Sequence, residues 1–291
     1  MTKISLLFLF ATITIFSPTN SLAQPSTEIY LFDLTSKKGQ VTISNPVNIS
    51  NHIGYDNQPF FHPSLPVLYY VSAQDSGKTD IIEYNYTTNS RRNFTTTVEN
   101  EYSPQVTPDG KFISCILQRA NGEQNLVKYP ISRGEAVVLI NNLTVGYHAW
   151  LDNTIAGVFT LPRPFALHLV NFSTKKDSII AHNIGRSLHK IPGEDAVSYL
   201  QKIDATNWEI KKFTGAQSLT IVKSVVSTEH DMTWAGEGKI LMSSERKIFF
   251  CDEKNPQEWK EINIQSPFSI NTITRLAVNA TGNKIAIVVN E

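Results

Sequence analysis

Two stretches of this chain share one pattern: Ser103-Pro104-Gln105-Val106-Thr107-Pro108-Asp109-Gly110-Lys111 and, about 45 residues earlier, Gln58-Pro59-Phe60-Phe61-His62-Pro63-Ser64. Each runs directly into an apolar segment rich in β-branched and aromatic residues. A period of about 40 to 45 residues, made of short strands separated by Pro, Asp and Gly, is typical of a four-stranded propeller blade. The repeat therefore predicts an all-β propeller.

Turn sequences related to Asp109-Gly110-Lys111 recur along the chain. Pro108 fixes its φ angle, Asp109 can accept a hydrogen bond from the backbone two residues on, and Gly110 accepts a positive φ. The counterparts are Ser64-Leu65, Pro192-Gly193-Glu194, Glu237-Gly238-Lys239 and Thr281-Gly282-Asn283, with a shortened version within Tyr147–Asn153. The strands predicted after these turns are Val67–Val71, Phe112–Leu117, Ile155–Phe159, Ala196–Leu200, Ile240–Ser243 and Ile285–Val289. The chain therefore holds six repeats, and helical folds are excluded.

The two ends of the chain complement each other. The last repeat ends after two strands, whereas two strands, Glu28–Leu34 and Gln40–Ser44, precede the first turn sequence. Joined in one sheet, these segments complete a four-stranded blade and remove two unpaired edges. We therefore expect a six-bladed propeller of antiparallel blades, closed into a ring by the N-terminal strands.

The first residues have the pattern of a signal peptide. Lys3 precedes the apolar stretch Ile4–Phe16, and Ser21-Leu22-Ala23 offers small side chains where a signal peptidase cleaves. A membrane anchor is the alternative, but the stretch is shorter than the ~20 residues needed to cross a bilayer. We expect a signal peptide over residues 1–23, one propeller domain over residues 24–291, and export to the periplasm or the cell exterior.

Composition limits the partners and the cysteine chemistry. The 26 basic and 26 acidic residues give a net charge of zero, so neither nucleic acid nor an anionic membrane surface is an expected partner. We expect a monomer that does not span a membrane. Cys115 and Cys251 lie in different repeats, where they are either buried free thiols or one disulfide.

The repeats resemble those of a known family. Gln58-Pro59, the segment Ser72–Ile81 and the segment Tyr102–Lys111 resemble the WD40-like blade motif of TolB-family propellers. The segments Tyr147–Trp150 and Ile184–Gly193 resemble those of exported, functionally uncharacterised six-bladed members. This resemblance covers nearly all of the chain after residue 23, and it implies a fold rather than a chemistry, because such blades serve docking proteins, sugar and peptide binders, and parts of peptidases.

Motifs of catalysis are absent from the sequence. It contains no Gly-x-Ser-x-Gly elbow, no His-Glu-x-x-His pair and no phosphate-binding loop, and Gly236-Glu237-Gly238-Lys239 is interpreted as a turn between strands. The segment Asp75–Asp80 resembles a sialidase Asp-box, but Ala73 and Asp80 occupy positions where that motif needs other residues. We interpret it as a hairpin turn.

Ring geometry indicates where a functional surface would lie. The innermost strand of each blade begins at one mouth of the central channel, so the residues just before these strands should converge there. The candidate ligand-binding residues on this basis are Asp56, Tyr102, Tyr147, His148, Arg186, His230 and Asp231, and Arg163 joins them from the loop Pro162-Arg163-Pro164-Phe165. The alternative is that His148 and Arg186 only satisfy buried polar groups near the channel.

The predicted function is binding rather than catalysis. We expect a non-catalytic module that binds a protein, peptide or glycan at the channel-mouth face, with no catalytic residue and no metal ligand assigned. A metal-assisted hydrolase or lyase at the same face is the alternative, in which His148, His230, Asp56 and Asp231 would act as bases or ligands. No cofactor is expected, and calcium is the one ion left open.

Overall fold

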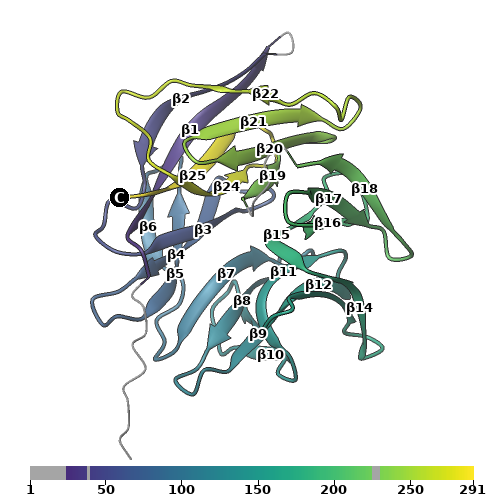
Figure 1. Ribbon diagram of the computed structural model, residues 1–291. Coiled ribbons are helices and arrows are strands. Elements are labelled where there is room, and N and C mark those ends of the chain that lie inside the picture. Colours follow the sequence, from purple (N-terminus) through teal and green to yellow (C-terminus); the bar gives the residue numbers. More distant parts are fainter. Residues whose placement is uncertain (1–23, 38–39, 225–229) are drawn as a thin grey trace, which may run out of the picture.

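The computed structural model describes residues 24–37, 40–224 and 230–291, and all of its regular elements are strands. These strands form six sheets arranged around one axis, as Figure 1 shows. The six-bladed, all-β architecture predicted from the repeats is confirmed. The signal peptide predicted over residues 1–23 lies outside the described residues.

Five blades are each built from four consecutive strands, which run antiparallel from the channel outward. Blade 1 contains β3 (Asp56–Phe61), β4 (Val67–Ala73), β5 (Thr79–Asn85) and β6 (Ser90–Asn93). Blade 2 contains β7 (Asn100–Val106), β8 (Phe112–Gln118), β9 (Gln124–Pro130) and β10 (Val137–Ile140). Blade 3 contains β11 (Thr144–Trp150), β12 (Ile155–Leu161), β13 (Ala166–Asn171) and β14 (Lys176–His182).

Blades 4 and 5 repeat this order, and blade 6 joins the two ends of the chain. Blade 4 contains β15 (Ile184–Lys190), β16 (Val197–Lys202), β17 (Trp208–Phe213) and β18 (Ser218–Lys223). Blade 5 contains β19 (Met232–Trp234), β20 (Lys239–Ser244), β21 (Lys247–Asp252) and β22 (Lys260–Glu261). Blade 6 contains β24 (Ile273–Val278), β25 (Lys284–Asn290), β1 (Thr27–Lys37) and β2 (Gln40–Asn48).

The closure of the ring is confirmed by the pairing of β1 with β25. The two strands are antiparallel from Thr27 opposite Asn290 to Asp33 opposite Lys284, and the Lys284 ammonium lies 2.6 Å from the Asp33 carboxylate. The backbone N–H of Glu291 also donates to the carbonyl of Ser26. The purple N-terminal strands and the yellow C-terminal strands therefore share one sheet (Figure 1).

Blade 6 differs from the prediction in one respect. A fifth strand, β23 (Asn263–Ile264), pairs with the outer edge of β2, and this pairing is parallel. The long connection from blade 5 to blade 6 supplies it and covers the open edge of β2. A two-residue strand of this kind carries no repeat signal in the sequence.

The hydrophobic core is divided among the spaces between neighbouring blades. Six clusters of buried side chains are present, and each combines residues of two adjacent blades. In β4, Leu68 and Tyr70 join the cluster shared with blade 6, whereas Val67 and Tyr69 join the cluster shared with blade 2. Because successive side chains of a strand point to opposite faces, the central strands are apolar on both faces.

The turns have the chemistry that the sequence predicts. The N–H of Gly110 donates to the carbonyl of Thr107 over 2.8 Å, the Asp109 carboxylate accepts from the N–H of Lys111 over 3.1 Å, and Gly110 has a φ of 68°. Asp75–Asp80 spans the connection from β4 to β5, and Gly236–Lys239 that from β19 to β20, so both interpretations as turns are confirmed.

The cysteines are free thiols, and both are buried. Cys115 lies in β8 and Cys251 in β21, which belong to blades 2 and 5 on opposite sides of the ring. A disulfide between them is therefore excluded, because its two Cα atoms must lie within about 7 Å of each other. Within the described residues, no helix is long and apolar enough to cross a membrane.

Candidate functional site

The inner strands begin on one face of the ring, which we call the mouth face. They start earlier than expected in blades 1 to 4: Asp56 is the first residue of β3, Tyr102 lies inside β7, Tyr147 and His148 lie inside β11, and Arg186 lies inside β15. The prediction that these residues precede the strands was therefore wrong. In five blades, the register between the inner strand and its neighbour shifts near these positions. Such bulges redirect side chains, and here they do so beside the channel.

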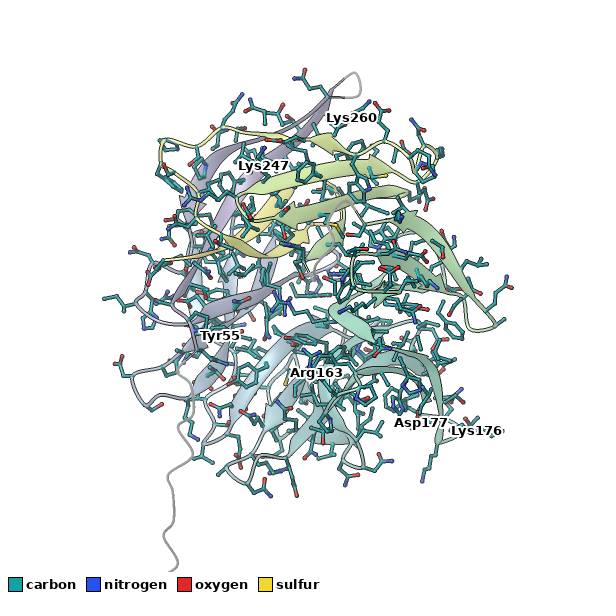
Figure 2. All side chains as sticks on the ribbon, viewed as in Figure 1. Tyr55, Arg163, Lys176, Asp177, Lys247 and Lys260 are labelled. Atoms are coloured by element: carbon teal, nitrogen blue, oxygen red, sulfur yellow. The ribbon has the colours of Figure 1, made fainter. Side chains whose placement is uncertain are left out.

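One cavity of about 400 Å³ opens at the mouth face, between blades 2 and 3, and we call it the mouth cavity. Figure 2 labels two of its residues, Tyr55 and Arg163, which come from blades 1 and 3. Its lining consists of aromatic, amide, guanidinium and small apolar groups: Gln24, Tyr55, Gln58, Tyr102, Ile116, Gln118, Gln124, Gly146, Tyr147, Phe159, Leu161, Arg163, Phe165 and Arg186.

A second cavity of about 380 Å³, which we call the channel cavity, occupies the axis of the ring. It extends toward the opposite face, where the turns at Pro63, Pro108 and Pro192 form its rim. Trp150 and Trp234 contribute apolar wall, and His148, His189 and Asp231 contribute polar groups. Gln58, Tyr147 and Arg186 line both cavities and therefore lie between them.

A hydrogen-bonded group of three side chains closes the channel between the cavities. The Arg275 guanidinium lies 3.0 Å from the Asp231 carboxylate and donates to the Tyr147 hydroxyl over 2.9 Å. Arg275 belongs to blade 6 and Tyr147 to blade 3, which stand opposite each other in the ring, so this contact crosses the channel. We call Arg275, Asp231 and Tyr147 the channel plug.

The channel plug is fixed by further contacts. Asp231 also accepts hydrogen bonds from the Ser187 hydroxyl over 2.8 Å and from the N–H of Leu276 over 2.7 Å. Burial opposes the charge of Arg275, but Tyr147 and Asp231 favour it, so its pKa is raised above the usual range of a guanidinium. The plug therefore holds a permanent positive charge that is already neutralised by Asp231.

The structure distributes the eight predicted residues over several environments. Tyr102 and Arg163 line the mouth cavity, His148 and Asp231 line the channel cavity, and Tyr147 and Arg186 line both. Asp56 and His230 line neither of the two. The predicted set therefore does not meet at one point, although six of its members line one or both cavities.

His148 belongs to a seam between blades 2 and 3 that recurs between blades 4 and 5. The indole N–H of Trp150 donates to the Ser114 hydroxyl, whose oxygen lies 2.7 Å from Nε2 of His148. At the corresponding place, the indole of Trp234 donates to Ser198. Burial lowers the pKa of His148 to about 3, so this imidazole is neutral at physiological pH. These contacts agree with the alternative interpretation, in which His148 satisfies buried polar groups.

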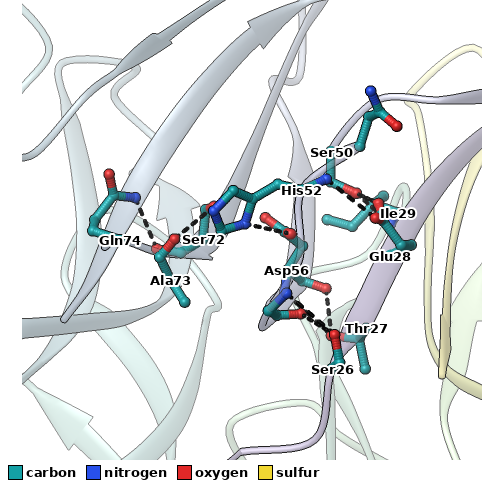
Figure 3. Close-up of polar contacts among 12 residues, drawn as sticks. Ser26, Thr27, Glu28, Ile29, Ser50, His52, Asp56, Ser72, Ala73 and Gln74 are labelled. Carbon is teal, nitrogen blue, oxygen red and sulfur yellow. Dashed lines mark hydrogen bonds and ion pairs between the residues drawn. The ribbon is translucent and has the colours of Figure 1, made fainter. Parts of the chain in front are cut away.

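Asp56 lies in a buried polar cluster at the seam between blades 6 and 1, drawn in Figure 3. Its carboxylate lies 3.5 Å from Nδ1 of His52, and its backbone contacts the Thr27 hydroxyl. Glu28 in the same cluster accepts hydrogen bonds from the Ser50 hydroxyl and the N–H of His52. Burial raises the pKa of Asp56 to about 6, although Ser72 and His52 act in the other direction. The cluster joins β1 to β3 at the closure of the ring.

Glu101 in β7 is a second buried carboxyl group near the mouth face, with no exposed surface. It accepts hydrogen bonds from the hydroxyls of Thr97 over 2.6 Å and Tyr129 over 3.0 Å. Burial nevertheless raises its pKa from 4.5 to about 7. The folded protein therefore keeps the Glu101 proton over a pH range in which the unfolded chain releases it.

The raised pKa of Glu101 predicts a change of stability with pH. Because the folded state binds the proton more tightly, the contribution of Glu101 is present in full at low pH and is lost as the pH rises through about 7. In the wild type, Glu101 should make the free energy of unfolding smaller at about pH 8 than at about pH 5, by up to roughly 3 kcal/mol. Glu101→Gln should remove this contribution to the pH dependence. Urea unfolding at both pH values measures it, and equal pH slopes for the two proteins would contradict it.

The sequence did not indicate several residues that shape the site. Arg275 holds the channel plug, and Gln118 and Gln124 line the mouth cavity, whereas Tyr55, which also lines it, lies within the segment 52–57 that was expected at the channel mouth. Gln118 and Gln124 flank the turn between β8 and β9, so the repeat alignment could have placed them on the mouth face. No local signal distinguishes Arg275 from other polar residues of a strand. Among the described residues, no group of three or more His, Cys, Asp or Glu side chains is arranged to hold a metal ion.

Comparison with known proteins shows the fold. No protein-family model and no curated protein matches this sequence. A putative TolB from Agrobacterium tumefaciens superimposes with a TM-score of 0.68 at 12% identity, covering 92% of this chain and 99% of that one. TolB from Acinetobacter baumannii gives a TM-score of 0.58 at 10% identity, with 91% of this chain covering 65% of that protein. The similarity confirms, for the fold, the resemblance to TolB six-bladed propellers.

Propellers of other kinds are also similar. An oligogalacturonate lyase in complex with manganese gives a TM-score of 0.52 at 14% identity, covering 90% of this chain and 78% of that one. At these identities the similarity concerns the fold alone, and the site has to be interpreted from its own residues.

Proposed function

We propose that this protein is an exported, non-catalytic binding module whose ligand occupies the mouth cavity. The observation that carries the proposal is the lining of this cavity, in which tyrosine and phenylalanine rings surround amide and guanidinium groups. Side chains of these types bind by stacking and hydrogen bonding, and a few such polar groups in a cavity of this size are typical of ligand sites. Export rests on the leader pattern of residues 1–23.

The walls of the mouth cavity are preorganised. Tyr147 is held by the hydrogen bond from Arg275 and packs against Phe159 with ring centroids 5.4 Å apart. Phe159 in turn packs against Phe165 at 4.9 Å, and the Arg163 guanidinium lies 4.5 Å from the centre of the Phe165 ring. A ligand therefore meets groups that are already in place, which reduces the entropic cost of binding.

Capture of the partner tests the proposal. The purified wild-type protein, used as bait in an extract of the envelope of the source organism, should retain a protein, peptide or glycan. A bait with Arg163→Ala, Gln118→Ala and Gln124→Ala should retain at least about tenfold less, a loss of about 1.4 kcal/mol. Within the described structure these three side chains form no hydrogen bond, and the contact that is lost is the stacking of Arg163 on Phe165, so thermal unfolding should change little.

Lys111→Ala is the matched control, because it removes a cation from an exposed turn on the opposite face. Equal capture by the triple variant and the wild type would contradict the proposal.

A metal-assisted hydrolase or lyase at the same face is the alternative function, and metal binding by the purified wild-type protein tests it. If the protein is such an enzyme, calcium, zinc or manganese should raise its unfolding temperature strongly in a thermal-shift titration, because an ion that binds only the folded state shifts the unfolding equilibrium.

A further inference from the structure

The charged groups of the mouth cavity have one sign. Among the described residues that line it, the charged side chains are Arg163 and Arg186. Arg186 is held in place, since its guanidinium donates to the carbonyl of Thr274 over 3.2 Å. Arg163 stacks on Phe165 and makes no ion pair with any described residue. The channel plug differs, because Asp231 compensates Arg275 there. The mouth cavity is therefore suited to an anionic ligand.

Two amide groups lie in the same cavity without partners of their own. Gln118 and Gln124 stand opposite each other in the register of β8 and β9, and both line the mouth cavity. Neither side-chain amide forms a hydrogen bond with another described residue, although each offers two donor hydrogens and an acceptor oxygen. A pair of neighbouring amides can bind adjacent hydroxyl groups, each of which both donates and accepts.

Aromatic rings form the remaining wall. Tyr55, Tyr102 and Tyr147 line the cavity, together with Phe159 and Phe165. Burial raises the pKa of the Tyr55 hydroxyl above its usual range, so it remains a hydrogen-bond donor at neutral pH. Aromatic rings with polar tips offer an apolar face for stacking beside a hydrogen-bonding group.

We propose that the mouth cavity binds an acidic carbohydrate, with the ligand carboxylate on the Arg163 guanidinium and sugar hydroxyls on the Gln118 and Gln124 amides. This inference rests on the proposed function, since it names the ligand class of the same cavity. A sugar ring combines the three features that the walls complement: apolar C–H faces, adjacent hydroxyls and, in a uronate, a carboxylate. An acidic peptide would use the guanidinium and the rings but would bring no adjacent hydroxyls to the amide pair.

Calorimetric titration with a panel of glucuronate and galacturonate trisaccharides tests the inference. At least one should bind, its neutral methyl ester should bind at least about tenfold more weakly, and Arg163→Ala should abolish the difference between acid and ester. Gln118→Ala with Gln124→Ala should weaken acid and ester alike, because the amides contact hydroxyls that both share. Affinity of the acid should fall with added salt. Lys111→Ala should bind as the wild type does.

The outcomes separate this inference from the proposed function. Equal binding of acids and esters, or binding of an acidic peptide and of no sugar, would overturn the inference and leave the mouth cavity as a binding site. Failure of every sugar would also overturn it, and the capture experiment with the triple variant would then decide the proposed function independently. Sugar binding that persists unchanged in Arg163→Ala and in the Gln118 and Gln124 variant would show a site elsewhere, contradicting both.

Discussion

A chain that lacks residues 28–44 should fail to form the propeller. This deletion removes most of β1 and β2, which contribute Ile29, Phe32 and Ile43 to the clusters on both faces of blade 6. It also exposes β25, whose whole length pairs with β1, as an unpaired apolar edge of the kind that aggregates. We expect insoluble protein, or soluble protein without a cooperative unfolding transition by circular dichroism.

A circular permutant serves as the control for this deletion, because it moves the chain ends but keeps the strands that close the ring. Glu291 and Ser26 are hydrogen-bonded neighbours, so a short glycine-containing turn can join them and make β25 and β1 a hairpin. New termini at Ile53, which is 88% exposed, would then leave the six blades intact. This permutant should fold and unfold in one transition. A deletion variant as soluble and as stable as the full chain would show that the N-terminal strands do not close the ring.

Asp231→Ala should be among the most destabilising single substitutions on the channel. Asp231 is 3% exposed and neutralises Arg275, which is 9% exposed, and it also accepts from Ser187 and Leu276. Removing one partner of a buried ion pair leaves the other charge without compensation, at a cost of about 3–5 kcal/mol. Urea unfolding should show a lower midpoint with an unchanged slope.

Two comparisons make this prediction specific. Glu261→Ala breaks the exposed pair with Lys247, whose charged groups lie 2.8 Å apart, and it should change stability by less than about 1 kcal/mol. Asp231→Leu combined with Arg275→Leu removes both charges and should recover part of the loss, because no uncompensated charge remains buried. A cost for Asp231→Ala as small as that for Glu261→Ala would show that the channel plug does not stabilise the fold.

Local signals in the sequence were sufficient to predict the six-bladed architecture. The φ of 68° at Gly110 and the bond from Lys111 to Asp109 depend on residues within one turn, so the turn pattern is visible in each repeat. The continuous apolar run of β4 likewise follows from the burial of both of its faces. Closure of the ring could be predicted because the strands missing from the last repeat were present before the first.

The site was harder to predict from the sequence than the fold, because its contacts join repeats that are far apart along the chain. Arg275 and Tyr147 are 128 residues apart and meet only because blades 3 and 6 face each other across the channel. The bulges that redirect the inner strands carry no sequence signal that could be recognised, so Tyr147 and Arg186 were placed before their strands. Asp56 was expected at the channel mouth, but it is fully buried at the seam with β1.

Photocrosslinking on the two faces tests the central claim, that this propeller binds through its mouth face. Asn121 lies in the turn between β8 and β9 on the mouth face, and Asp109 lies in the turn between β7 and β8 on the opposite face; each accepts a hydrogen bond from the backbone two residues on. Benzoylphenylalanine at Asn121 should give a covalent adduct in cells of the source organism, and at Asp109 it should give none. An adduct at Asp109 without one at Asn121 would contradict the account.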